Sequence, residues 1–149
     1  MSLQQRITDE MKTAMRDGDS LRVSVIRMLR ASFKNKEIDK GKGETLTEQD
    51  VLEIVVSAVK QHKDSIDQFQ KGGRMDLVSK EEKELEILQA YLPKSLSLDE
   101  LRETARILIK EIGAQGPKDM GKVMKALMPQ VTGRVDGSAV SQVVKELLS

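Results

Sequence analysis

Apolar residues recur every three or four positions along almost the whole chain, and this spacing constrains the fold more than any other feature. The pattern begins with Leu3, Ile7 and Met11 and is still present at Val140 and Val144 near the end. Such a period places apolar side chains along one face of a helix. No segment alternates polar and apolar residues over the length of a strand. The sequence therefore predicts an all-α fold.

Glycine and proline residues divide this pattern into successive helices. We expect a first helix that ends near Gly18, and a second that is capped by Asp19 or Ser20 and ends at Gly41. A third helix is expected over about residues 48–71, opened by a capping box of Thr47 and Asp50. A fourth is expected over about residues 76–91, and Pro93 prevents its continuation. The first 93 residues therefore predict four helices.

Three further helices are expected after Pro93. A capping box of Ser97 and Glu100 opens the fifth, the sixth begins at Pro117, and Pro129 with Gly133 closes it. Asp136 or Ser138 can cap the seventh. We therefore expect an N-terminal domain of about four helices over residues 1–93 and a small C-terminal three-helix domain over residues 94–149.

The composition excludes several kinds of active site. The chain has no cysteine and a single histidine, and its 25 basic and 24 acidic residues leave a net charge of +1. A nucleic-acid partner would therefore have to bind a local patch. We expect His62 to be a boundary or core residue, and the glutamates of the fourth helix, Glu81 and Glu84 among them, to form a solvated face. No catalytic residue, metal site or cofactor is expected.

The sequence also gives an expectation for localisation. The N-terminal residues lack the apolar core of a signal peptide, and the apolar stretch from Val51 to Val59 is too short to span a bilayer. We therefore expect a cytoplasmic protein without a membrane partner.

A glycine among lysines near the start of the sixth helix is the best candidate for a binding site. Lys118, Gly121, Lys122 and Lys125 fall on one side of the helical wheel. The free N–H groups and dipole of a helix N-terminus favour an anion such as phosphate. Asp119 in the same turn would oppose one. The alternative interpretation is that these residues form the solvent-exposed face of an amphipathic helix, and the two interpretations are about equally supported.

Two neighbouring features belong to the same candidate region. Gly133 and Arg134 follow the sixth helix and again place a basic side chain beside glycine. Methionines occupy the other face of that helix at Met120, Met124 and Met128. They are interpreted mainly as core, and alternatively as an exposed groove for a protein partner.

Several separated motifs resemble the YqeY family over essentially the whole chain. They are Ser24–Leu29, Gly73–Val78, Glu84–Leu88 leading to Tyr91-Leu92-Pro93, Asp119–Lys125 and Gly133–Ser138. That family is similar to the C-terminal tail of GatB, a subunit of the tRNA-dependent amidotransferase. The resemblance implies an all-helical fold of two domains and a tail that contacts tRNA without carrying out the chemistry.

The residue patterns and this resemblance together give three functions as expectations, and the resemblance itself implies tRNA contact only for Lys122, Lys125 and Arg134. The first is an accessory tRNA-binding module without a catalytic centre, which grips phosphates through Lys118, Lys122, Lys125 and Arg134, with Gly121 and Gly133 beside them. The second is an adaptor that docks on an amidotransferase or an aminoacyl-tRNA synthetase. The third is a glutamine-dependent carbon–nitrogen ligase, a label that would rest on family association alone, and we expect the chain not to be an enzyme.

Overall fold

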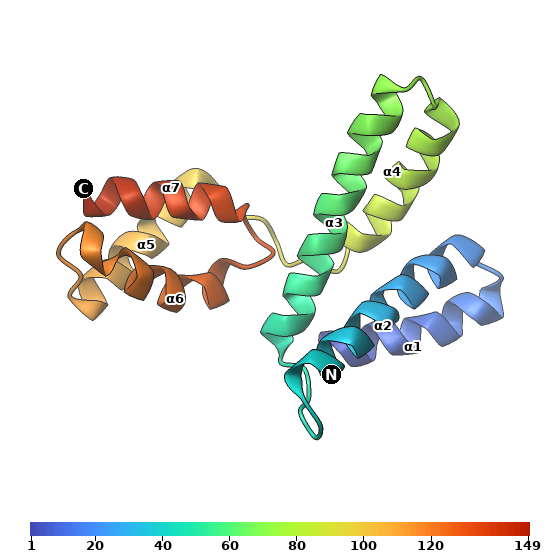
Figure 1. Ribbon diagram of the computed structural model, residues 1–149, viewed down its shortest axis with the longest axis horizontal. Coiled ribbons are helices and arrows are strands. Elements are labelled where there is room, and N and C mark those ends of the chain that lie inside the picture. The colour runs from blue at the N-terminus through green and yellow to red at the C-terminus, as the bar shows by residue number, and fades with distance from the viewer. The chain divides into compact units, whose positions relative to one another are not determined.

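The computed structural model describes all 149 residues and contains seven α-helices and no strand, which confirms the all-α prediction (Figure 1). The chain divides into two compact units, Met1–Leu92 and Pro93–Ser149. The elements are α1 (Leu3–Asp17), α2 (Ser20–Lys40), α3 (Glu48–Lys71), α4 (Met75–Gln89), α5 (Leu98–Ile112), the 3₁₀ turn η1 (Pro117–Asp119), α6 (Met120–Val131) and α7 (Gly137–Leu148).

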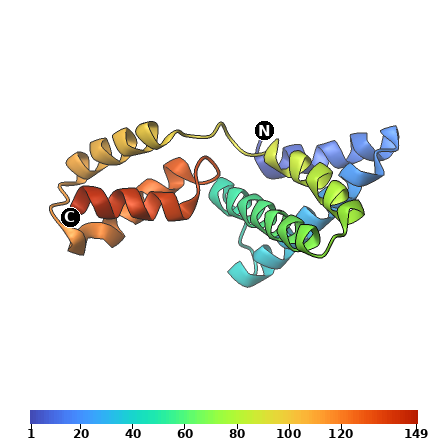
Figure 2. The same ribbon diagram turned by 90° about the horizontal axis from the view of Figure 1, so that it is seen from above.

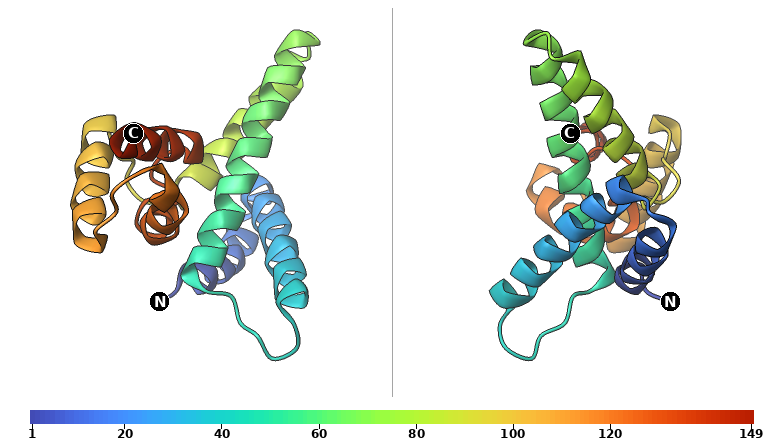
Figure 3. Two further views of the ribbon diagram at one scale, coloured as in Figure 1. Left: turned by 60° about the vertical axis from the view of Figure 1, so that its left-hand side comes forward. Right: turned by 90° about the vertical axis from the view of Figure 1, so that its right-hand side faces the viewer.

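Two helical hairpins build the N-terminal unit. Helix α1 lies beside α2, and α3 lies beside α4 over much of its length (Figure 3). Each hairpin turns at a glycine with positive φ, Gly18 in the first and Gly73 in the second. The apolar faces of all four helices meet in one core, which includes Ile26, Val55 and Leu88, none of them measurably exposed.

The predicted capping box at the start of α3 is present and also holds the α2–α3 loop. The Thr47 hydroxyl accepts from the Asp50 N–H, and the Asp50 carboxylate accepts from the Thr47 N–H. Lys40 Nζ lies 2.7 Å from the same carboxylate. The hydrogen bond from Lys40 and that from Thr47 lower the pKa of Asp50 to about 2. The stability that the ionised Asp50 carboxylate contributes is complete above the usual pKa of an aspartate, and it is lost as the pH falls through that value toward 2.

A buried tyrosine joins the end of α4 to α1. The Tyr91 hydroxyl donates to Glu10 Oε2 at 2.5 Å, and the Arg6 guanidinium carbon lies 5.3 Å from the centre of the tyrosine ring. Burial and the hydrogen bond to the Glu10 carboxylate raise the pKa of Tyr91 to about 12. The folded unit therefore favours the neutral phenol.

We expect this phenol to titrate about two pH units above an unfolded tyrosine, with a midpoint near pH 12. Because Tyr91 is the only tyrosine in the chain, tyrosinate absorbance measures it alone. The contribution of Tyr91 to folding stability should be complete below about pH 10 and be lost as the pH rises through 12.

Glu10→Gln should lower this midpoint, because the variant removes the carboxylate but keeps Tyr91 buried. Glu44→Gln, which changes an exposed glutamate in the α2–α3 loop, should leave it unchanged. A wild-type midpoint near pH 10, with circular dichroism still showing folded helices, would contradict the expectation.

Three helices pack around a separate core in the C-terminal unit (Figure 2). Helix α5 is capped by Ser97, whose hydroxyl accepts from the Glu100 N–H as predicted. Helix α7 is capped by Asp136, whose carboxylate accepts from the Ser138 N–H. Leu101, Leu127 and Val144 have no exposed surface and anchor one helix each in this core.

The sixth helix ends between Pro129 and Gly133, the two residues predicted to close it. Helix α6 contains Pro129 and continues to Val131. A proline in the last turn deprives only the carbonyl of Lys125 of its usual N–H partner, so the helix can pass through it. Gly133, at φ 80°, then reverses the chain direction.

Candidate functional sites

Three exposed lysines lie near the start of the sixth helix. Lys118 lies on η1. Lys122 follows four residues later on α6, and Lys125 follows three residues after Lys122. The three-residue spacing on α6 places Lys122 and Lys125 on one face, and Lys118 precedes them on η1. We call these three exposed lysines the lysine stripe. The opposite face of α6 carries Val123 and Leu127, both fully buried. Core packing therefore fixes the direction in which the stripe points.

No lysine of this stripe forms an ion pair with a carboxylate. The salt bridges of the C-terminal unit involve Arg102 and Arg106 of α5. Asp119, which we expected to oppose a phosphate, is held in its own turn, where its Oδ2 accepts from the Gln115 N–H at 2.9 Å. The stripe is thus a set of solvated cations available to an anion.

Arg134 has a structural role in the C-terminal unit. Its Nε donates to the Lys94 carbonyl at 3.0 Å, and its own carbonyl accepts from the Leu96 N–H at 2.8 Å. These bonds fasten residues 94–96 to the α6–α7 loop. Sequence reasoning placed Arg134 with the lysines, but the structure shows its guanidinium engaged with the backbone.

The two glycines of the predicted site serve the backbone in different ways. Gly121 is an exposed helical residue with open space where a side chain would stand, so no neighbouring protein atom requires a glycine there. Gly133 adopts a positive φ that favours glycine. Neither glycine by itself forms a backbone binding site for an anion.

The methionines of α6 belong to the core. Met120, Met124 and Met128 are half-buried and pack against the buried residues of the C-terminal unit. This packing supports their interpretation as core.

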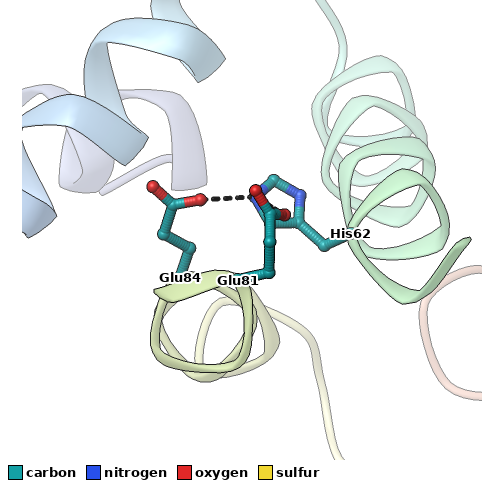
Figure 4. Close-up of side chains that lie close together, drawn as sticks. All are labelled: His62, Glu81 and Glu84. Carbon is teal, nitrogen blue, oxygen red and sulfur yellow. Dashed lines mark hydrogen bonds and ion pairs between the residues drawn. The ribbon is translucent and has the colours of Figure 1, made fainter. Parts of the chain in front are cut away.

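A histidine and two glutamates converge between α3 and α4, in an arrangement that the sequence reasoning missed (Figure 4). His62 is 7% exposed, and its Nε2 lies 3.1 Å from Glu84 Oε2 and 3.6 Å from Glu81 Oε2. Its Nδ1 lies 2.8 Å from the Ala58 carbonyl. The prediction of a buried histidine is confirmed, but the prediction that Glu81 and Glu84 belong to a solvated face is wrong.

One sequence signal could have indicated this cluster. Glu81 and Glu84 are three residues apart, so they share a helix face. His62 and Glu84 are equally distant in sequence from Gly73, where the α3–α4 hairpin turns. Residues equidistant from the turn of an antiparallel hairpin lie opposite each other, and the histidine therefore faces the glutamates.

The folded chain is an all-helical protein of two units, each with its own core. No helix is long and apolar enough to cross a membrane. The family model described as Yqey-like protein matches residues 4–148. The chain belongs to this YqeY family, which confirms the resemblance identified from its motifs.

Relatives in several fungi carry the name "Altered inheritance of mitochondria protein 41, mitochondrial". The relative from Lachancea thermotolerans is 37% identical over 110 residues, which cover 72% of this chain and 58% of the relative. That from Saccharomyces cerevisiae strain YJM789 is 31% identical over 130 residues, covering 85% and 66%. That from Pyrenophora tritici-repentis is 29% identical over 149 residues, covering 96% and 79%. The chain spans less than two thirds of the length of the first two.

These relatives contradict the expectation of a cytoplasmic protein. All three are named as mitochondrial. The expectation was drawn from the absence of an apolar signal core, and that criterion tests only for secretion. An amphipathic, arginine-rich transit peptide would not be recognised by it.

Proposed function

We propose that the C-terminal unit binds structured RNA, with tRNA as its ligand, through phosphate contacts from Lys118, Lys122 and Lys125. The observation that carries this proposal is the lysine stripe itself, because its three ammonium groups are exposed and have no acidic partner. The resemblance to the GatB tail supplies the choice of tRNA. The proposal leaves out Arg134, whose guanidinium donates to the Lys94 carbonyl.

Phosphate contacts fit the side chains that this unit offers. A stacking platform for single-stranded bases needs several exposed aromatic rings. The C-terminal unit has no aromatic residue, since Phe33, Phe69 and Tyr91 all lie before it. Lysines on a rigid helix can instead follow a folded RNA backbone by charge and shape. In this proposal the chain is a binding module that carries out no reaction of its own.

The alternative of a protein adaptor is less well supported. It relied on an exposed methionine groove, whereas the three methionines of α6 are half-buried and packed against the core. Nuclease treatment would separate the two functions, because a partner held through RNA would be released and a directly bound protein would not.

Titration of the full chain against deacylated tRNA in a mobility-shift assay tests the proposal. Each phosphate contact steepens the dependence of log K on log salt by roughly 0.7–0.9. Three contacts therefore predict a slope of about −2 to −3. Absence of binding at low salt, or binding that does not weaken as salt rises, would show that the lysine stripe is not a phosphate site.

A further inference from the structure

We propose that His62, Glu81 and Glu84 form a binding site for a divalent transition-metal ion of the zinc type. The site lies wholly within the α3–α4 hairpin. It is independent of the proposed RNA contact, which uses α6.

The donor atoms already lie at distances suited to one ion. Zinc–nitrogen and zinc–oxygen bonds near 2.0–2.2 Å in tetrahedral geometry place neighbouring donors about 3.4 Å apart. His62 Nε2 lies 3.1 Å from Glu84 Oε2 and 3.6 Å from Glu81 Oε2, and all three donors lie within 4.8 Å of one another. Small side-chain adjustments would bring all three to coordination distance.

The backbone fixes the orientation of the imidazole ring. A carbonyl oxygen only accepts hydrogen bonds, so the 2.8 Å contact of His62 Nδ1 with the Ala58 carbonyl places a hydrogen on Nδ1. In the neutral ring, Nε2 then carries a lone pair that points at two carboxylates. Metal-binding histidines are commonly oriented in this way by a hydrogen bond from the other ring nitrogen to a backbone carbonyl. A cation between Nε2 and the glutamates would accept electron pairs from all three groups.

Charge around the cluster also favours a cation. Two carboxylates face one buried ring, and neither glutamate forms an ion pair with a lysine or arginine. Lys80 and Lys83 of α4 and Lys63 of α3 are exposed and do not pair with these carboxylates, whose only ion-pair partner is His62. A divalent ion would balance both negative charges where the glutamates are only 22% and 12% exposed.

The donor set indicates which metals fit. Magnesium and calcium are bound mainly by oxygen ligands, whereas imidazole suits zinc and its neighbours in the first transition row. Three protein ligands leave a fourth tetrahedral position open for water or another ligand. The bound ion would also join α3 to α4, so its binding should stabilise the hairpin.

Cobalt and zinc titrations of the full chain without an added histidine tag test this site. The chain has one histidine and no cysteine, so any imidazole–cobalt signature must come from His62. We expect Co²⁺ to give tetrahedral visible absorption and paramagnetic shifts of the single imidazole, and Zn²⁺ to abolish both. Saturating Zn²⁺ should raise the unfolding midpoint of the N-terminal unit by about 10 °C.

Glu81→Gln and Glu84→Gln should each weaken zinc binding at least tenfold. Glu82→Gln, which makes the same charge change at an exposed position of α4, should bind like the wild type. Equal losses of zinc affinity in all three variants would indicate that the ion is attracted by the general negative charge of α4, and would overturn the proposed site. If a variant fails to fold, the cobalt titration of the wild type still tests the site. Imidazole resonances that do not shift at millimolar Co²⁺ would show that the histidine–glutamate cluster is purely structural and binds no metal.

Discussion

Replacement of both Lys122 and Lys125 by glutamate is expected to weaken tRNA binding about 60-fold at 0.1 M salt. The two contacts together account for a slope of about 1.8 in log K against log salt, and at 0.1 M this corresponds to a factor of about 60. The slope itself should become shallower by about 2. Both side chains are solvated, so the variant should keep its fold. Mobility shifts at several salt concentrations measure both quantities.

The matched control is Lys60→Glu with Lys63→Glu. These two lysines of α3 are also exposed and three residues apart, so the variant carries the same change in net charge and the same spacing. We expect a small, uniform reduction in affinity from the altered net charge. If the control weakens binding as much as the change on α6, RNA is attracted by charge alone and the lysine stripe has no special role.

Replacement of Leu127 by alanine is expected to destabilise the C-terminal unit by about 3–4 kcal/mol. Leu127 is fully buried between α5 and α7, and leucine-to-alanine changes at such sites lose both transfer free energy and packing. A unit this small has little stability in reserve, so a large fraction of it should be unfolded at 37 °C. Amide exchange should accelerate in α5–α7 and remain unchanged in α1–α4, whose core is separate.

Leu98→Ala provides the control for this effect. Leu98 lies on α5 of the same unit but is 52% exposed, so its truncation should cost well under 1 kcal/mol. Loss of tRNA binding by Leu127→Ala with retention by Leu98→Ala would also tie the interaction to a folded α6. Similar exchange rates in the two variants would mean that Leu127 contributes far less to the core than its burial indicates.

The helices were predictable because the signals that define them are local. The period of apolar residues and the caps at Thr47 and Ser97 depend only on neighbours in sequence, and the third helix has its expected range. The end of the sixth helix was predictable for the same reason. Pro129 lies in the last turn of α6, and Gly133 follows the helix at a positive φ.

The candidate sites were predictable only in part. Lys122 and Lys125 share a face because helical spacing places them there, but the bonding of Arg134 to Lys94 spans 40 residues and has no local signature. The meeting of His62 with Glu81 and Glu84 likewise depends on the antiparallel pairing of two helices. Composition could show that one histidine was present and could not show what faced it.

The attachment of residues 94–96 to the α6–α7 loop has a practical consequence for cutting the protein into fragments. A C-terminal fragment that begins at Ser97 would contain every helix of its unit, yet it would lose the Lys94 carbonyl and the Leu96 N–H that Arg134 binds. A fragment that begins at Pro93 would keep both partners. Expression trials and limited proteolysis should therefore find the resistant N-terminus of this unit ahead of α5, within residues that have no helical structure themselves.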